Sequence, residues 1–387
     1  MARVVPFRAL RFASLEALPR RAIDDIAAVR DQGRRLSAED PLHVLRLYAA
    51  ADPWAALWSW EAAGHLVSED PALYLVEARP ADPFERRAPV RFLLGAMESD
   101  VPELEQEVDR SPQPPLEPVP VLAVDDQHVL RDRFAEAAEQ RAPDWESVVG
   151  SERIRTWRLG AGAQTRRIRA AVEEARARPL GQIPEHGPFL AAIVPLSEPG
   201  LRLVPFHRGL RDLSTFSPDR FLALVADYAR IYDLELPLNT PEGLEEGRER
   251  LADLAPRHHG FLLVLPGGDG KLLRFRQGLE LSQIRAAPRS PTLRSLDLAL
   301  LNGLVLRTVL GLRDPEVPEH PNVRPVGSIE EMVRAVEAGV FQAGFALNPP
   351  PVWELRAVIE AAQALPPRTM RLSPAPPTGL LFLDPRP

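Results

Sequence analysis

The sequence predicts a mixed α/β protein of two lobes, in which mixed sheets are flanked by helices. At 387 residues the chain exceeds the usual size of one domain, so two lobes are the default expectation. Hydrophobic residues make up 45% of the chain and charged residues 26%, which is ordinary globular usage. Segments with apolar residues at helical spacing and short apolar runs typical of strands both recur along the chain. We therefore expect both kinds of element throughout.

The N-terminal half predicts a short strand followed by helices and further strands. The best-marked helix occupies 53–64, where Trp54, Leu57 and Trp58 have helical spacing and Gly64 is placed to end it. The other expected elements are strands at 3–8, 72–77, 90–94, 121–124 and 153–159, and helices at 15–30, 129–141 and 165–178. Residues 111–120 hold five prolines, which predicts a linker or a rigid surface loop.

Residues 179–188 form a break rich in proline and glycine. We take this break as the junction between the lobes, so the predicted domains are 1–180 and 188–387.

The C-terminal half contains clearer helix starts. Ser217 is an N-cap before Pro218, and the residues that follow predict one buried helix face, made of Phe221, Leu224, Val225, Tyr228 and Ile231. Further helices are expected from Thr240–Pro241, at 296–310, at 329–338 with a capping box of Ser328 and Glu331 and a stop at Gly339, and at 352–365. Strands are expected at 189–195, 201–206, 340–347 and 379–383, with a hairpin at 260–275 that turns at 267–270.

The composition excludes several classes of function. The chain has no cysteine, which rules out disulfides, thiolate zinc sites and cysteine nucleophiles. A formal charge of −7 argues against nonspecific binding of nucleic acid. No segment approaches the roughly 18 apolar residues of a membrane span, and the N-terminus lacks the apolar stretch of a signal peptide. We therefore expect a cytoplasmic protein that binds neither nucleic acid nor membrane.

Three motifs invite functional interpretations that their spacing does not support. Residues 266–272 resemble a phosphate loop, but leucines stand at 265 and 272, where that loop needs a glycine and a hydroxyl, so a hairpin turn is favoured. The turn at 160–162 lacks the third glycine of a dinucleotide site. His258 and His259 suggest a metal pair, yet adjacent positions project differently. A distant carboxylate could complete a site there, but nothing in the spacing requires one. We expect no cofactor and no metal.

The candidate ligand-binding residues are His207, Arg208 and His186. His207 and Arg208 follow a predicted strand whose end can present polar side chains to a cleft, and an imidazole beside a guanidinium suits an anionic ligand. Salt bridging to Asp212 or Asp219 is the simpler explanation. No catalytic residue is assigned.

Several short blocks together resemble a bacterial family, domain-of-unknown-function family 1015. The blocks are weak singly, but they occur in the family's order: 6–11, 40–46, 64–67, 71–74, 203–208, 212–213, 217–218, 259–261, 296–301, 310–312, 343–347, 365–369 and 379–382.

The departures from this family bear on function. Its members usually have an Ala-Asp-Gly-His-His-Arg block, which resembles the phosphate-handling block of partition-protein-like folds, some of which serve as free-serine kinases. This chain has only 179–187 at that place, and its proline-rich 111–120 replaces a Lys-His-Glu stretch. Phosphoryl chemistry needs such polar groups held together. The sequence therefore predicts a degenerate member, with a degenerate active site and a degenerate first lobe. Such a member binds an unknown small molecule or protein partner without the family's chemistry.

The alternative is a nucleotide-dependent kinase, or another phosphate-handling enzyme, acting on a small hydroxy metabolite such as serine. It would use a rebuilt site that contains His207, Arg208 and His186.

Overall fold

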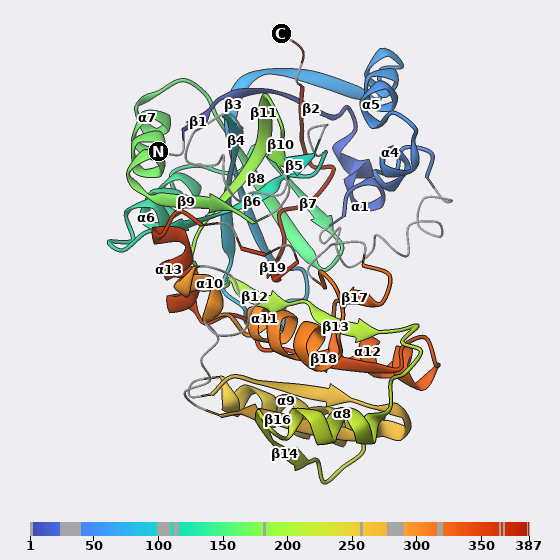
Figure 1. Cartoon of the computed structure of the whole chain (residues 1–387). Helices are drawn as coiled ribbons and strands as arrows, with labels where there is room; N and C mark the ends of the chain where they lie inside the picture. Colours follow the sequence, from blue (N-terminus) through green and yellow to red (C-terminus); the bar gives the residue numbers. More distant parts are fainter. Residues whose placement is uncertain are drawn as a thin grey trace. The chain divides into compact units, whose positions relative to one another are not determined.

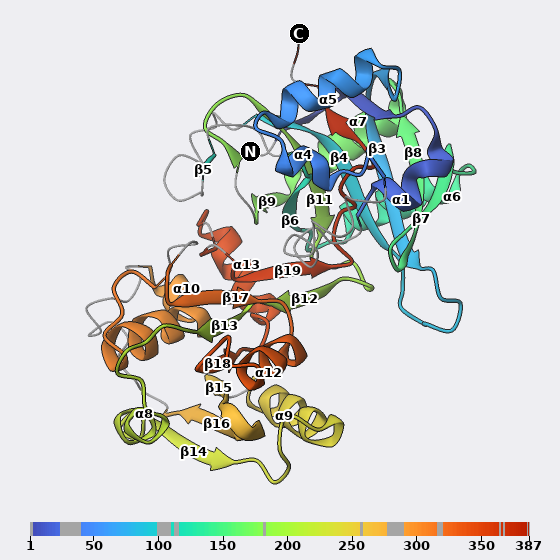
Figure 2. The ribbon, with the colours of Figure 1, turned by 90° about the vertical axis from the view of Figure 1, so that its right-hand side faces the viewer.

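The computed structural model describes residues 3–23, 40–98, 110–111, 116–180, 183–255, 258–276, 290–315, 320–363, 365–366, 368–384 and 386. The chain forms two compact units. Unit 1 comprises Met1–Arg202, Ala362–Ala364 and Leu372–Pro387, and unit 2 comprises Leu203–Ala361 and Leu365–Arg371. Helices and strands occur in both units, so the predicted mixed α/β class is confirmed (Figures 1 and 2).

Unit 1 is built on a large mixed sheet. Its main path runs β20-β2-β3-β4-β11-β6-β9, with β1 paired to β4 and with β8 paired to both β3 and β7. β6 and β11 run parallel, whereas β4 pairs with β11 antiparallel. The strands are β1 Val4–Val5, β2 Phe7–Phe12, β3 Leu66–Pro80, β4 Val90–Glu98, β6 Val119–Val124, β7 Trp145–Val149, β8 Glu152–Leu159, β9 Arg176–Pro179, β11 Pro188–Pro195 and β20 Phe382–Leu383.

The helices of unit 1 bury apolar stripes against this sheet. In α6 (Val129–Glu139), Leu130, Phe134 and Ala137 recur at helical spacing and are buried in one core with residues of α7 (Ala163–Glu174), β3, β4 and β11. Figure 1 shows α6 and α7 beside one another. The other helices are the short η1 Leu15–Ala17 and α1 Leu18–Arg21, with α4 Leu45–Ala49 and α5 Pro53–Ala62, which pack on each other.

Two small strand pairs accompany the main sheets. β5 (Arg110–Ser111) runs parallel to β10 (Ile183–Pro184). β12 (Arg202–Pro205) pairs with β19 (Met370–Ser373).

Unit 2 is built on a six-stranded sheet in the order β14-β16-β15-β18-β13-β17, and its neighbouring strands run antiparallel. The strands are β13 His207–Leu210, β14 Ala229–Asp233, β15 Gly260–Val264, β16 Gly270–Phe275, β17 Val323–Val326 and β18 Ala343–Ala346. All of β15 is buried, because helices cover both faces of the sheet. Phe261 and Leu263 belong to one core, and Leu262 and Val264 belong to the other.

The two cores of unit 2 define which helices lie on each face. The Phe261 core contains residues of α8 (Pro218–Val225), α11 (Asp297–Leu300) and η6 (Leu301–Val309). The Leu262 core contains residues of α9 (Pro241–Leu254) and α12 (Ile329–Glu337). Outside these cores, α10 (Pro291–Arg294) packs on α13 (Val352–Glu360). Figure 2 shows α9 and α12 next to each other beside the sheet.

Local capping patterns in unit 2 are confirmed. The Ser217 and Thr240 side chains accept hydrogen bonds from backbone N–H groups of Arg220 and Gly243, at 3.5 and 3.1 Å. The Ser328 hydroxyl likewise accepts from the Glu331 N–H at 3.1 Å.

The predicted hairpin at 260–275 is also confirmed, since β15 and β16 pair antiparallel across the turn η4 (Pro266–Gly268). Gly267 in this turn has a φ of 77°, which glycine adopts without strain.

Several expected boundaries shift. The helix predicted to 178 ends at Glu174, because the next residues form β9 and pair with β6. The break at 179–188 lies within unit 1, where it includes β10 and the start of β11, and the chain passes to unit 2 after Arg202. Of the helix predicted at 15–30, η1 and α1 are present up to Arg21, and 24–30 lie outside the described residues.

One predicted buried face is wrong in part. Phe221 and Val225 of α8 are buried, but Leu224 is 43% exposed. The helix ends at Val225, so Tyr228 and Ile231 lie beyond it, and Ile231 belongs to β14. Helical spacing places residues on one face only within the helix, so it does not apply to residues beyond its end.

Within the described residues, no helix combines the length and the apolar character that crossing a bilayer requires.

Candidate functional site

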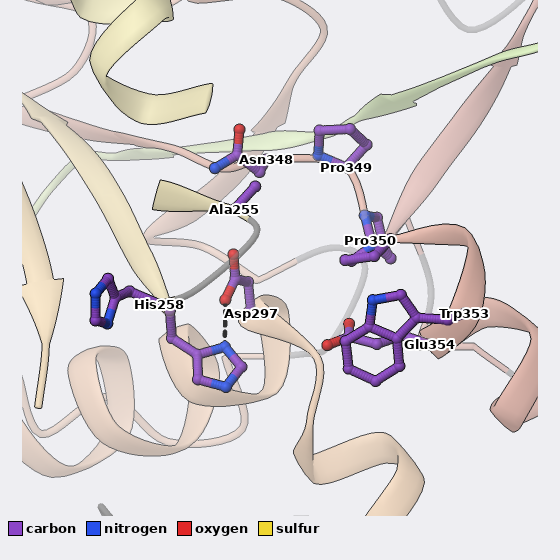
Figure 3. Close-up of a pocket in the computed structure, with 10 residues that line it drawn as sticks. Ala255, His258, Asp297, Asn348, Pro349, Pro350, Trp353 and Glu354 are labelled. Carbon is purple, nitrogen blue, oxygen red and sulfur yellow. Dashed lines mark hydrogen bonds and ion pairs between the residues drawn. The ribbon is translucent and has the colours of Figure 1, made fainter. Parts of the chain in front are cut away.

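A pocket of about 210 Å³ in unit 2 gathers titratable side chains from three separate parts of the chain (Figure 3). Among the described residues, its lining combines histidines, carboxyls, an amide, prolines and a tryptophan: Ala255, His258, His259, Asp297, Asn348, Pro349, Pro350, Pro351, Trp353 and Glu354. The histidines directly precede β15, Asp297 begins α11, and Glu354 lies in the first turn of α13.

His259 and Asp297 form a hydrogen-bonded pair. His259 Nδ1 donates to Asp297 Oδ1 at 2.7 Å, drawn as the dashed line in Figure 3. The hydrogen bond to Asp297 raises the pKa of His259 above its usual value, since the carboxylate favours the protonated imidazole. Burial raises the pKa of Asp297, and the bond to His259 opposes that shift. With Nδ1 bonded to the carboxylate, a neutral His259 presents Nε2 as an acceptor.

The hairpin fixes the backbone of His259. The carbonyl of His259 accepts a hydrogen bond from the Phe275 N–H at 2.9 Å, which extends the β15–β16 ladder by one residue.

Glu354 differs from the other acidic group of the pocket because it has no partner among the described residues. The residue is only 5% exposed, and no described residue forms a hydrogen bond or an ion pair with its carboxyl oxygens. Burial raises the pKa of Glu354 to about 7, and the negative charge of Asp297 adds to the shift.

The remaining lining gives the pocket its shape. Pro349, Pro350 and Pro351 form a stiff segment before α13, because each proline ring fixes its own φ. Asn348 is held by a hydrogen bond from its Nδ2 to the Leu251 carbonyl at 2.6 Å. Trp353 is 66% exposed although it borders the pocket.

The arrangement can accept hydrogen bonds and exchange protons. A histidine oriented by a carboxylate is the arrangement of a general base, and a carboxyl that titrates near pH 7 can give or take a proton. None of the described residues that line the pocket is a lysine or an arginine. The described part of the chain also contains no group of three or more His, Asp or Glu side chains arranged to hold a metal ion.

The structure places His207 and Arg208 on β13, and neither belongs to this lining. His207 pairs with Val326 and Arg208 pairs with Phe345, residues that belong to the two opposite cores of unit 2. Successive residues of a strand point to opposite faces of the sheet, so these two side chains cannot meet in one pocket.

Both side chains make internal contacts. His207 Nδ1 accepts the Leu347 N–H at 3.2 Å, and burial lowers the pKa of His207 to about 4. The Arg208 guanidinium donates to the carbonyls of Phe206, His207 and Arg368 at 2.9 to 3.2 Å, and burial lowers its pKa to about 10. The expected salt bridge to Asp212 is made instead by Arg211, at 3.6 Å.

His186 lies in unit 1, in the turn between β10 and β11, and its side chain is exposed. The prediction that His186, His207 and Arg208 bind a ligand stays a prediction.

Residues 163–299 match the model of a family described as "Protein of unknown function (DUF1015)". The match covers 137 of the 387 residues, so this part of the chain is similar to the family. The DUF1015 match begins with α7 in unit 1, extends into unit 2 and ends just after Asp297. It therefore includes His259 and Asp297, whereas Trp353 and Glu354 lie outside it. No curated protein and no solved structure matches the chain.

The sequence singled out His258 and His259 but did not indicate Asp297, the partner of His259. Asp297 is 38 residues away and Glu354 is more distant still, so no local spacing connects them. Two features of the sequence pointed towards this pocket: the pair of adjacent histidines, and the acidic residue within the family block at 296–301.

Proposed function

We propose that the chain binds a small ligand in the pocket around His259, Asp297 and Glu354. This is the binding function expected from the sequence, at a different place. The observation that supports it best is Glu354, a buried carboxyl without a hydrogen-bond partner among the described residues. Burying an unpaired carboxyl costs free energy, so such a group is rarely kept for stability alone and is typical of a functional site.

The alternative, a nucleotide-dependent kinase, has less support. Phosphates are usually held by lysine, arginine or the N–H groups of a helix start. The described lining of the pocket has no lysine or arginine, and the helix starts in it, those of α11 and α13, carry the acidic Asp297 and Glu354 in their first turns. The loop at 266–272 connects two antiparallel strands instead of leading into a helix.

A fragment screen by ligand-observed NMR tests the proposal. The library should contain anionic, neutral and cationic fragments in equal number, so that no ligand class is assumed. We expect some fragments to bind the full chain and to lose binding in Ala255→Phe, which fills the pocket. The matched control is Ala223→Phe on the exposed side of α8, which should bind the same fragments as the unmodified protein.

Both variants should first be checked for folding by circular dichroism. The proposal fails if no fragment of any charge binds, or if Ala255→Phe, correctly folded, binds them as the control does.

A further inference from the structure

We propose that the ligand of this pocket is a small organic cation with an ammonium group, which Glu354 pairs with and Trp353 covers. This inference rests on the proposed function and deepens it by naming the ligand class. Three features of the described lining support it: its hydrogen-bonding polarity, its unpaired carboxyl and its exposed aromatic ring.

Several of the polar atoms offered to a ligand are acceptors. Glu354 presents both carboxyl oxygens. Asn348 uses one N–H of its Nδ2 to bond the Leu251 carbonyl, which leaves its amide oxygen as an acceptor and its second N–H as a donor. Neutral His259, with Nδ1 donating to Asp297, presents the lone pair of Nε2. These acceptors favour a ligand that donates, and an ammonium group has three donors and no acceptor.

The charge balance of the pocket also favours a cation. With Glu354 ionised, the described lining residues are net negative in either state of His259: by one charge when protonated His259 cancels ionised Asp297, and by two when His259 is neutral. The groups that face Glu354 are Asp297 of α11 and His259 at the start of β15, with His258 next to it. α10 also packs on α13, and its charged residue is Arg294. A bound ammonium group would supply the counter-charge that Glu354 lacks.

Trp353 provides the third feature. Its side chain follows the rigid proline segment and is 66% exposed at the pocket, directly before Glu354 in the sequence. The face of an indole attracts a cation within about 6 Å of the ring, and tryptophan does so best among the aromatic residues. A carboxylate and an indole at one opening form a site suited to an organic cation. The cavity of about 210 Å³ limits the ligand to a small molecule, below the usual range for drug-sized ligands.

An NMR titration with three probes of equal length tests the ligand class. Butylammonium, butanol and butyrate differ in charge but hardly in size. We expect butylammonium to bind at the pocket and the other two probes to bind at least tenfold more weakly. Affinity for butylammonium should rise roughly tenfold between pH 6 and pH 8, because Glu354, whose pKa burial raises to about 7, loses its proton over this range.

Two variants on the same helix separate the role of Glu354 from a general effect. Glu354→Gln keeps the shape of the side chain and should weaken butylammonium at least tenfold while flattening its pH dependence. Glu360→Gln, exposed at the end of α13, should leave both unchanged. Trp353→Ala should weaken butylammonium several-fold.

The outcomes distinguish this inference from the proposed function. If butyrate or butanol binds the pocket as well as butylammonium does, or if Glu354→Gln binds butylammonium unchanged, the ligand class is wrong although the pocket still binds ligands. If fragments of other chemistry bind while butylammonium does not, the inference also fails. If no fragment and no probe binds, both proposals fail.

Discussion

Two buried glutamates, one in each unit, differ in whether they have ion-pair partners. Glu77 of β3 is 1% exposed and forms ion pairs with Arg79, Arg91 and Arg155. Two of these arginines stand directly opposite it on neighbouring strands, Arg91 on β4 and Arg155 on β8. Glu354 of α13 is 5% exposed and has no such partner among the described residues.

The difference follows from the elements that hold the two glutamates. A residue in the middle of a sheet has a directly opposed neighbour on each side, so register alone supplies partners for Glu77. Glu354 lies in the first turn of a helix beside a pocket, and the charged group with the largest effect on its pKa is another acid, Asp297. The charge of Glu77 is neutralised by arginines of its own and of neighbouring strands, whereas Glu354 has no ion-pair partner among the described residues.

The largest effect on stability is expected when the carboxylate of Glu77 is replaced by an uncharged group. Glu77→Gln leaves three guanidinium groups without their shared carboxylate, which should lower the free energy of unfolding by about 2–4 kcal/mol, since the arginines remain partly solvated. Urea unfolding at pH 7 measures this change. The control is Glu136→Gln, an exposed pair on α6, with an expected change below about 0.5 kcal/mol. Equal losses in the two variants would contradict the comparison.

The buried guanidinium of Arg208 also has its hydrogen-bond partners inside the protein, so replacing it should lower the free energy of unfolding. Arg208→Lys cannot reproduce the three hydrogen bonds to carbonyls, so unfolding should become easier by about 1–3 kcal/mol. We expect phosphate and sulfate to stabilise the unmodified protein and the variant equally in a thermal-shift assay. Stabilisation by an anion that disappears in the variant would instead support the anion site predicted from the sequence.

Glu354→Gln should alter the pH dependence of stability. The carboxyl titrates near 4.5 in the unfolded chain and at about 7 in the fold, so between these values the folded state holds one more proton. The free energy of unfolding therefore falls as pH rises from about 4.5 to 7 and stays level above. The glutamine variant should lose this fall, which amounts to about 1–3 kcal/mol after allowance for solvent screening.

Urea unfolding between pH 4 and 8 checks this prediction. Glu198 of unit 1, whose pKa burial also raises to about 7, keeps its own contribution in both proteins. A variant with the same pH slope as the unmodified chain would show that Glu354 is not the unpaired group described here.

The smallest effect on stability is expected at an exposed position. This substitution tests whether burial determines how much stability is lost. Leu224→Ala should change the free energy of unfolding by less than about 1 kcal/mol, because the side chain is 43% exposed. Val225→Ala, one residue on and fully buried, should cost about 1–3 kcal/mol. Melting temperatures of the two variants show which substitution destabilises the protein more. A greater loss of stability for Leu224→Ala would support the buried helix face predicted from the sequence.

The sequence by itself determined those features of the chain that depend on near neighbours. The mixed α/β class, the N-caps at Ser217, Thr240 and Ser328, and the hairpin between β15 and β16 are all encoded within a few residues. Each follows from spacing or from a side chain that bonds a backbone group three positions on. The family resemblance, likewise a matter of local blocks in order, is confirmed over residues 163–299.

Only the tertiary structure decided which polar residues share a site. His207 and Arg208 are adjacent in sequence, yet strand geometry sends them to opposite faces. His259, Asp297 and Glu354 are far apart in sequence, yet β15, α11 and α13 bring them to one pocket. Local patterns report the period of an element, whereas the pairing of a histidine with a distant carboxylate depends on packing between elements, which no local spacing records.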